Sequence, residues 1–417
     1  MAASDDNAPE QACRSCGAPL AEVFVDLGAS PVSNAFVRYE SRNRPEPFYP
    51  LRAFVCGKCL LVQIEDVVAP ESHFHADYAY FSSVTAGWVE HARRFVEQAV
   101  DRHRLGPESF VVEVASNDGY LLKHFVARGV PCLGIDPAAN CAEAAARSGV
   151  PTEVAFFGRA TAERIAARGR LADLTVANNV LAHVPDLNDF VAGFARLLAP
   201  SGAASFEFPH LLRLIEGNQF DTIYHEHYSY LSLIALEPLF RRHGLALRDV
   251  EELATHGGSL RLMVRHAAHP DPTTDRLAQL MDRERTAGLD RLETYAGFRE
   301  QVRATKRKLL SLLIDLKRSG KRIAGYGAPA KGNTLLNYCG IGTDFLDYTV
   351  DRSPAKQGLF LPGTRIPVLA PEHLLADRPD YVLILPWNIR DEVMAQMAEV
   401  TAWGGRFIVP IPEPMVV

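Results

Sequence analysis

Phe110-Val-Val-Glu-Val-Ala-Ser-Asn-Asp-Gly119-Tyr-Leu-Leu-Lys-His-Phe-Val-Ala-Arg128 is the stretch that decides the fold. Its first six residues predict a buried strand, residues 116–119 predict a tight turn, and the residues from Tyr120 onward predict a helix. A strand, a small polar turn and a helix N-terminus together form the ligand crevice of a doubly wound sheet. We therefore expect an α/β domain with Rossmann-like topology to start here.

The residues that follow continue the alternation of strands and helices. The predicted elements are a strand over 131–136, a helix over 140–147, a strand over 152–156, a helix over 159–167, and strands over 171–179 and 203–210. The second strand ends in Asp136, where an acidic residue can bind the ribose hydroxyls of a nucleotide. Right-handed crossovers would bring these strand ends to one edge of the sheet.

Two classes of ligand fit this crevice, a dinucleotide and S-adenosylmethionine. The turn over 115–119 lacks the Gly-x-Gly-x-x-Gly pattern that lets a pyrophosphate approach the backbone, which argues against NAD. Asn178 and Asn179 close the fourth strand, and His183 follows them. Polar groups at a strand end suit the pocket of a methyl donor, so the sequence favours a class I methyltransferase domain.

The composition is that of an ordinary globular protein. The chain has 417 residues, of which 47% are hydrophobic and 23% are charged, and this predicts two or three domains. A net charge of −6 argues against a nucleic-acid partner. No apolar run reaches membrane-spanning length, and the N-terminus lacks the basic and apolar regions of a signal peptide. We therefore expect a cytoplasmic protein with no membrane partner.

Two Cys-x-x-Cys pairs, Cys13 with Cys16 and Cys56 with Cys59, lie near the N-terminus. Four thiolates presented by two such turns form a closed tetrahedral site, which predicts structural zinc with no open catalytic position. The 39 residues between the pairs exceed the usual spacing, so we expect an inserted loop over 23–49. Redox chemistry is the weaker alternative, because no thioredoxin-like pattern flanks the pairs.

The segment Tyr224-His225-Glu226-His227-Tyr228 is the densest cluster of ionisable side chains with apolar flanks. Imidazoles near a carboxylate and tyrosine hydroxyls suit proton transfer. The two histidines lie two residues apart, so the segment does not match the His-Glu-x-x-His zinc motif, and in an extended segment both imidazoles would share one face. A solvated polar turn is the alternative. Its place directly after the fifth strand favours a site at the carboxyl edge of the sheet.

The C-terminal part repeats the strand, glycine turn and helix pattern in Gly325-Tyr-Gly-Ala-Pro-Ala-Lys331-Gly-Asn333. Taken alone it suggests a second dinucleotide site, although the third glycine is missing. Lys331 and Asn333 at the helix start suit a diphosphate. Upstream, His256-Gly-Gly-Ser-Leu-Arg261 brings an arginine that could meet a phosphate, although a structural hairpin explains its glycines equally well.

In this order, the motifs resemble those of the S-adenosylmethionine-dependent C-methyltransferases that act on nucleotide-linked 4-keto-deoxysugars, in antibiotic and cell-surface sugar biosynthesis. The resemblance covers nearly the whole chain. It implies a zinc-binding domain over 1–75, a methyltransferase domain over 76–255, and a Rossmann-like domain over 256–417 that helps to bind the nucleotide sugar. The implied reaction is methylation of a carbon next to the 4-keto group of a dTDP-linked sugar, with C-3 favoured over C-5.

The resemblance also implies roles for single residues. His227 is the expected base, Glu226 and His225 tune it, Tyr224 donates to the sugar, and Tyr78 is the substrate-facing tyrosine. The positions matching the methyl-donor site are Glu113, Asn117, Gly119, Asp136, Asn178 and Asn179. The expected substrate-binding residues are Tyr80, Ser82, Ser83, His183, Arg261, Lys331 and Asn333.

Two other functions remain open from the residues. One is an NAD-dependent nucleotide-sugar oxidoreductase or epimerase that uses the glycine turn at Gly325. The other is a non-catalytic binding module in which zinc and the α/β domains serve assembly. For the enzyme we expect a monomer or a small homo-oligomer.

Overall fold

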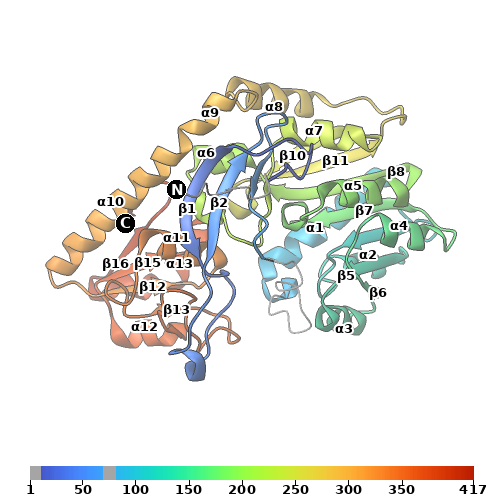
Figure 1. Ribbon diagram of the computed structural model, residues 1–417. Helices are drawn as coiled ribbons and strands as arrows, with labels where there is room; N and C mark the ends of the chain where they lie inside the picture. Colours follow the sequence, from blue (N-terminus) through green and yellow to red (C-terminus); the bar gives the residue numbers. More distant parts are fainter. Residues whose placement is uncertain (1–10, 69–80) are drawn as a thin grey trace.

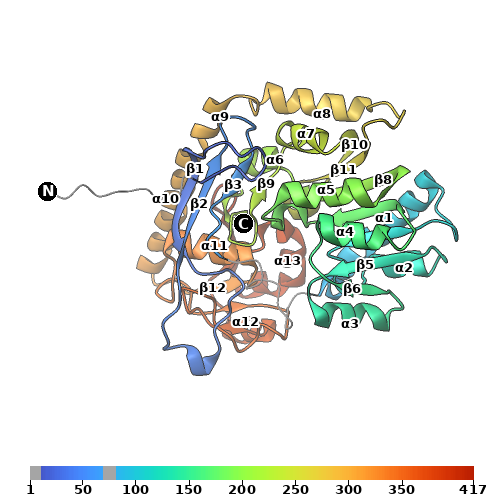
Figure 2. The same ribbon diagram turned by 45° about the vertical axis from the view of Figure 1, so that its right-hand side comes forward.

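The computed structural model describes residues 11–68 and 81–417, and its strands form three sheets of four, seven and six strands. The four-stranded sheet stands between a central lobe, drawn in green, and a C-terminal lobe, drawn in orange and red (Figure 1). The turned view keeps β1 and β2 beside α10 (Figure 2). The predicted α/β class is therefore confirmed.

The central sheet has the strand order β10-β11-β8-β7-β4-β5-β6. Its strands are β4 (Val111–Val114), β5 (Cys132–Asp136), β6 (Thr152–Val154), β7 (Ala172–Asn178), β8 (Leu198–Pro209), β10 (Leu245–Leu253) and β11 (Ser259–His266). The strands from β4 to β8 are parallel, whereas β10 and β11 are antiparallel additions. Because β4 lies between β5 and β7, the carboxyl end of β4 is the switch point where such sheets bind ligands.

Helices cover both faces of the central sheet (Figure 1). The helices along this part of the chain are α1 (Ala86–His103), α2 (Leu122–Val126), α3 (Ala139–Arg147), α4 (Arg159–Ala166), α5 (Leu187–Leu197), α6 (Leu211–Glu216) and α7 (Leu233–Arg242), of which α6 packs against the N-terminal sheet. The strands and helices predicted between 110 and 210 all form, with ends that shift by a few residues. The predicted domain boundary after residue 255 falls in the connection between β10 and β11. Because β11 pairs with β8, the residues after this boundary still belong to the central sheet.

The N-terminal sheet consists of β1 (Glu22–Ser30), β2 (Tyr49–Val55), β3 (Val62–Ile64) and β9 (Ser229–Tyr230). The predicted loop over 23–49 is wrong at its start, because β1 forms there. Phe24 in β1 is fully buried and stacks on Phe298 with ring centroids 4.5 Å apart, so apolar packing selects the strand. The last strand, β9, comes from the residues directly after the histidine cluster and pairs with β3.

The C-terminal lobe is an open sheet reached through α8 (Asp275–Thr286), α9 (Leu292–Ala296) and the long α10 (Phe298–Arg318). Its strands are β12 (Ile323–Tyr326), β13 (Thr349–Val350), β14 (Val368–Leu369), β15 (Tyr381–Ile384), β16 (Arg406–Val409) and β17 (Met415–Val416). Its helices are α11 (Ala330–Cys339), α12 (Pro371–Asp377) and α13 (Arg390–Gln396). Within 11–68 and 81–417, no helix is long and apolar enough to cross a membrane.

Glu284 in α8 joins the long connection to the central lobe. Its carboxylate accepts hydrogen bonds from the backbone N–H groups of Leu233 and Ile234, at the start of α7, at 2.9 Å each. The Nε2 atom of His210 lies 2.8 Å from the same carboxylate, and both side chains are fully buried. A carboxylate of α8 therefore accepts hydrogen bonds from the free backbone N–H groups at the N-terminus of α7.

Substituting Glu284 with alanine should lower the free energy of unfolding by about 3 to 5 kcal/mol, because His210 and two amides lose their buried partner. Urea unfolding followed by circular dichroism measures this change. Asp282→Ala, which breaks an exposed ion pair with Arg285 on the same helix, should change it by less than about 1 kcal/mol. Equal effects of the two substitutions would show that the buried network does not stabilise the fold.

Candidate active site

The turn after β4 is built from backbone that few side chains tolerate. Asn117 and Gly119 have positive φ angles of 49° and 77°. The N–H of Asn117 donates to the Asp136 carboxylate at 2.8 Å, which fastens the turn to the end of β5. Gly134 in β5 has to lack a side chain, because a Cβ there would lie 2.3 Å from the hydroxyl oxygen of Ser116. The predicted cofactor residues are thus brought together around one crevice.

The crevice is lined by acidic groups, and some of its buried polar atoms have no hydrogen-bond partner among the described residues. Burial raises the pKa of Glu113 well above its usual value, and the nearby carboxylates of Asp136 and Asp118 add to this rise. A hydrogen bond from Tyr120 has the opposite effect on this pKa. Burial also raises the pKa of Asp136. The side-chain amide of Asn178 is buried, and neither of its polar atoms has a hydrogen-bond partner in the part of the chain that the structure describes. A ligand with hydroxyl donors and a positive charge fits this lining, and S-adenosylmethionine has both.

Ser82 and Ser83 contact this turn through their backbone. Their N–H groups donate to the side chains of Asn117, at 2.9 Å, and Asp118, at 3.1 Å. They therefore lie at the predicted methyl-donor site, and the expected role of their hydroxyls at the substrate has no support in these contacts. The predicted substrate-facing Tyr78 and its neighbour Tyr80 lie outside the described residues.

The histidine cluster forms a tight turn after a short 3-10 helix over Phe220–Thr222, with the N–H of His227 bonded to the carbonyl of Tyr224 at 2.9 Å. The segment is not extended, so the two imidazoles do not share one face, and this turn sends them in different directions. His225 is buried against the N-terminal sheet, where its Nε2 lies 3.1 Å from the carbonyl oxygen of Pro50. We call residues 222–228 the catalytic turn.

The hydrogen bonds of His227 fix its tautomer. Its Nδ1 atom lies 3.0 Å from the carbonyl oxygen of Thr222, and a carbonyl only accepts, so Nδ1 carries the proton. The Nε2 atom therefore has a free electron pair, which accepts from the Tyr224 hydroxyl at 2.7 Å. Burial lowers the pKa of His227 well below its usual value, with His183 and Lys331 adding to this effect. The imidazole is thus neutral at physiological pH.

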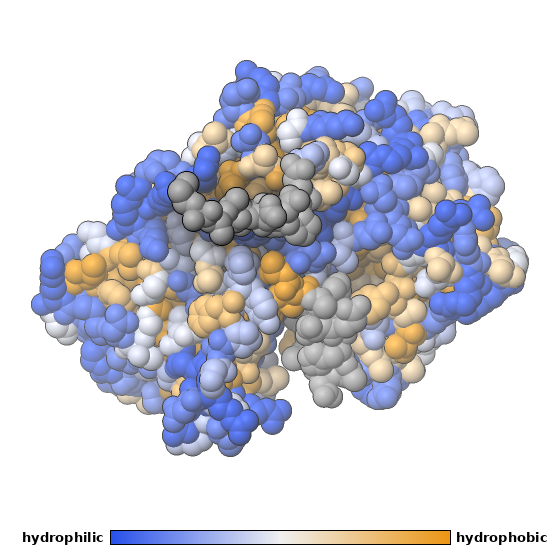
Figure 3. Space-filling view, viewed as in Figure 1, coloured by the Kyte–Doolittle hydropathy of each residue, from blue (hydrophilic) through white to orange (hydrophobic). Residues whose placement is uncertain are grey.

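His183 and Lys331 belong to the same cluster. The His183 ring lies edge-on to the His227 ring with centroids 4.6 Å apart. Lys331 at the start of α11 donates to the side-chain oxygen of Asn388 at 2.8 Å and lies over the Trp387 ring. His227 is therefore in contact with His183 of the central lobe, and its pKa is affected by Lys331 of the C-terminal lobe. Figure 3 shows that the visible surface is mostly hydrophilic, with smaller hydrophobic patches.

Glu226 turns to the N-terminal sheet. Its carboxylate is buried and accepts from the side-chain amide of Asn34 at 2.7 Å, so its bonding partner is Asn34 and its predicted tuning of His227 has no direct contact behind it. Burial raises its pKa to about 7, against the hydrogen bond from Asn34. The catalytic turn is thus attached to the zinc-binding part of the chain.

The titration of Glu226 gives the protein a pH-dependent stability. Its pKa rises from 4.5 in the unfolded chain to about 7 in the folded one, so its contribution is complete below pH 4.5 and is lost as the pH rises to about 7. Glu226→Gln does not ionise and should gain stability over the natural protein across this window, reaching about 3 kcal/mol above pH 7. Urea unfolding at pH 5 and pH 8 measures the gain, and a difference that does not depend on pH would contradict it.

Two predicted substrate residues are engaged elsewhere. Arg261 is buried and pairs with Glu207 at 2.9 Å and with Glu251 at 3.1 Å, so these carboxylates already use the guanidinium that was expected to meet a phosphate. Asn333 is buried and donates to the backbone carbonyl of Ser33 at 2.6 Å. Asn333 therefore joins α11 to the N-terminal segment, and neither contact supports a role at the substrate.

The glycine turn of the C-terminal lobe has the construction of the central one. Asp351 accepts the N–H of Ala328 at 2.7 Å, as Asp136 accepts that of Asn117. Gly327 has a φ of 88°, and a Cβ there would lie 2.6 Å from Pro386. The Rossmann-like shape predicted for this lobe is confirmed.

The four N-terminal cysteines converge as a metal site requires. Their Sγ atoms all lie within 4.8 Å of one another, and those of Cys13 and Cys59 are 3.5 Å apart. Sulfur atoms about 3.8 Å apart surround a tetrahedral zinc ion at its usual bond length, so the cluster fits zinc. Arg14 between the first two ligands donates to the carbonyls of Ile64 and Pro185, which ties the site to the central lobe.

Several neighbours of the cluster were missed by the sequence analysis. Asp221 is fully buried and accepts from the indole N–H of Trp387 at 2.7 Å, and Thr222 fixes the tautomer of His227. Asp221 and Thr222 are separated from the predicted cluster only by Ile223, so adjacency in the sequence was a usable signal for these two residues. Asn34 gave no signal, because only the fold brings it to Glu226.

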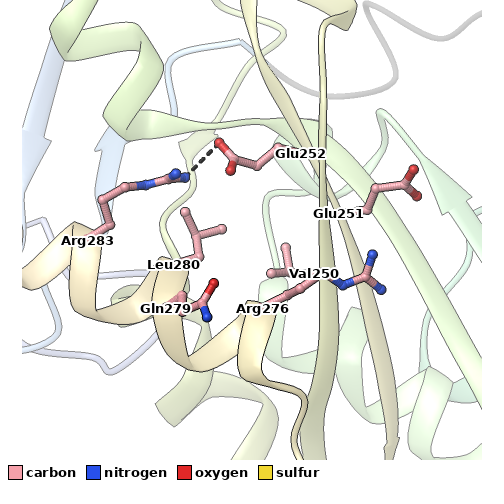
Figure 4. Close-up of a pocket in the computed structure, with 7 residues that line it drawn as sticks. All are labelled: Val250, Glu251, Glu252, Arg276, Gln279, Leu280 and Arg283. Carbon is pink, nitrogen blue, oxygen red and sulfur yellow. Dashed lines mark ion pairs between the residues drawn. The ribbon is translucent and has the colours of Figure 1, made fainter.

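A surface pocket between β10 and α8 is a poor alternative site (Figure 4). Its charged groups neutralise one another. Arg283 pairs with Glu252 at 2.7 Å, and Arg276 pairs with Asp249 at 2.5 Å. With these charges already paired, the pocket offers much less to a ligand than the crevice at β4 does.

Three family models match successive parts of the chain. A putative zinc-binding domain matches residues 13–74, a methyltransferase domain matches 88–250, and a C-methyltransferase C-terminal domain matches 254–412. These matches, together with the cysteine cluster, confirm S-adenosylmethionine and structural zinc as the cofactors of this chain.

A curated relative covers almost the whole chain. It is the C-methyltransferase NovU of Streptomyces niveus, which is 37% identical over 409 residues, 98% of this chain and 97% of the relative. Solved structures have lower sequence identity to this chain and cover less of it. Magnesium protoporphyrin IX methyltransferase from Synechocystis has 14% identity over 43% of this chain and 79% of its own, with a TM-score of 0.33. A methyltransferase from Clostridium acetobutylicum has 11% identity over 43% and 92%, with a TM-score of 0.36.

Proposed function

We propose that this chain, which belongs to the family of S-adenosylmethionine-dependent C-methyltransferases, methylates the carbon next to the 4-keto group of a dTDP-linked deoxysugar, at C-3 in preference to C-5. Carbon as the methylated atom is the family's property. The sugar rests on the resemblance of the motifs. The observation that supports the chemistry best is the fixed tautomer of His227, which presents the free electron pair of Nε2.

The base acts on a weak carbon acid. His227 Nε2 accepts the proton, the electron pair of the C–H bond forms a carbon–carbon double bond, and the ketone's π pair moves to its oxygen. Tyr224 has to release Nε2 before this step, and its hydroxyl is then free to donate to the substrate. When bound, S-adenosylmethionine supplies an electrophilic methyl group to the resulting carbon nucleophile.

The residues proposed to hold the methyl donor all lie at the β4 crevice. Asp136 binds the ribose hydroxyls, Glu113 faces the positive charge, and Asn117 and Gly119 shape the turn. Asn178 and Asn179 end β7 beside it. Both oxygens of Asp136 also accept backbone N–H groups, which holds the carboxylate in place and leaves each oxygen a further electron pair for a hydroxyl.

Incubation with S-adenosylmethionine carrying a ¹³C methyl group and a dTDP-4-keto-deoxysugar tests the proposal. We expect one labelled methyl on a ring carbon, and carbon–carbon coupling in the NMR spectrum of the product identifies that carbon. A label on oxygen or nitrogen would contradict the proposal, as would no transfer to any of several dTDP-4-ketosugars. The oxidoreductase alternative predicts instead a change in NADH absorbance with the same substrates.

A further inference from the structure

Lys331 has an unusual electrostatic position in the first turn of α11. It is only partly exposed, and its Nζ atom makes one hydrogen bond, to the neutral side chain of Asn388. No carboxylate of residues 11–68 and 81–417 lies within ion-pairing distance of this nitrogen. An ammonium group has three donors, so two remain for a ligand.

Two neighbours act on the charge and the position of Lys331. Burial lowers the pKa of Lys331 below its usual value, and the nearby carboxylate of Asp221 opposes this effect. Asp221 is itself fully buried and held by the indole N–H of Trp387, while the same indole ring lies under the ammonium, 4.8 Å from ring centroid to Nζ. A buried acid thus supports the cation from a distance without neutralising it by contact.

Lys331 also lies beside the base. The charge of Lys331 contributes to the lowered pKa of both His227 and His256. Asp221, which is bonded to the Trp387 ring under the ammonium, directly precedes Thr222, whose carbonyl binds Nδ1 of His227. The helix that carries it is attached to the catalytic turn, because the hydroxyl of Thr334 donates to the carbonyl of Ile223 at 3.1 Å. Lys331 therefore has a fixed place relative to His227.

We infer that the ammonium group of Lys331 donates to the ketone oxygen of the substrate and holds the negative charge that develops there when His227 removes the neighbouring proton. This inference rests on the proposed function. The ketone oxygen is two bonds from the carbon that loses the proton, whereas the diphosphate of a sugar nucleotide lies beyond the anomeric carbon. A cation on a helix that is bonded to the catalytic turn is therefore better placed for the ketone than for the diphosphate predicted from the sequence.

The chemistry explains why a cation is useful at this point. A ketone oxygen has a partial negative charge in the ground state and a full one after deprotonation, so a fixed donor binds the second form more strongly. Removing one such donor typically costs about 10²- to 10³-fold in rate. The C-terminal lobe is then a catalytic part of the enzyme as well as a binding part.

The test separates deprotonation from methyl transfer. The enzyme is saturated with S-adenosylhomocysteine, which has no methyl to give, and exchange of the substrate proton with D₂O is followed by NMR. Lys331→Met and Lys331→Gln should reduce the exchange rate at saturating substrate by about 10²- to 10³-fold. Binding of dTDP alone, measured by calorimetry, should change by less than about threefold, and Lys331→Arg should restore part of the rate.

Three results would overturn the inference in different ways. If the Lys331 variants exchanged the proton at the natural rate at saturating substrate but bound dTDP more weakly, Lys331 would be a diphosphate ligand. Loss of exchange in Lys308→Met, an exposed lysine of α10 paired with Glu413, would show that any lost lysine harms the enzyme. Neither exchange nor methyl transfer in the natural protein would refute the proposed function itself.

Discussion

Replacing His227 with alanine is expected to abolish exchange of the substrate proton next to the ketone, and methyl transfer with it, while S-adenosylmethionine still binds. The reason is that Nε2 of His227 is the acceptor that its hydrogen bond to Thr222 leaves unprotonated. A general base contributes about 10²- to 10⁴-fold, so the residual rate should fall to the background of the assay. Exchange in D₂O by NMR and binding of S-adenosylmethionine by calorimetry measure the two properties separately.

His225→Ala is the matched comparison, since it removes the same ring two residues away. That ring is buried against Pro50, so its loss should affect the stability of the N-terminal sheet more than the exchange rate. If His225→Ala stopped exchange and His227→Ala retained it, the base would be misassigned. If both variants retained exchange, the proton acceptor would lie outside the catalytic turn.

The sequence predicted those parts of the fold that depend on local pattern. Buried strands such as Val111–Val114 follow from short apolar runs, and the turn before Gly119 follows from small polar residues, so the central sheet was predictable. The prediction of a loop starting at residue 23 failed, because β1 is stabilised by pairing with β2 and by the contact of Phe24 with Phe298, which is far away in sequence. Such contacts are invisible to local patterns.

The candidate site divides in the same way. The residue types of the catalytic turn were evident from the sequence, but the directions of the side chains were not. The same residues could form an extended segment or a tight turn, and the two conformations place His225 differently. Arg261 has the chemistry of a phosphate ligand, and only the structure shows Glu207 and Glu251 already bound to it. The supporting contact of Asn34 depends on how the lobes meet.

All three parts of the chain hold the catalytic turn. Asn34 of the N-terminal part binds Glu226, and Thr334 of the C-terminal lobe binds the carbonyl of Ile223. In the central lobe, the ring of His183 lies edge-on to that of His227. The geometry of His227 is therefore a property of the assembled lobes. Damage to any one lobe should reach His227, even at a site that contacts neither substrate nor methyl donor.

Removal of zinc is the strongest test of this dependence. Arg14, between two of the ligands, donates to Ile64 in β3, and its guanidinium lies 5.2 Å from the ring centre of Tyr228. Structural zinc supplies an apparent 10 to 16 kcal/mol of binding free energy, which is about the whole stability of a domain. We expect the N-terminal sheet to unfold when a strong chelator removes the metal, and exchange activity to be lost in proportion to the zinc lost.

Cys56→Ser should reproduce the effect of the chelator, because it removes one of four ligands from a closed site. Zinc content by elemental analysis, unfolding by calorimetry and the exchange activity would be compared on the same samples. Cys132→Ser is the control, since that buried cysteine lies in β5 and outside the cluster. It should keep both zinc and activity, although its buried hydroxyl costs some stability. Zinc-free protein with the natural unfolding temperature and the natural exchange rate would show that the metal does not support the catalytic turn. Loss of activity with an unchanged unfolding temperature would mean that zinc acts on the turn locally, through Arg14 and Tyr228, and that the N-terminal sheet folds without it.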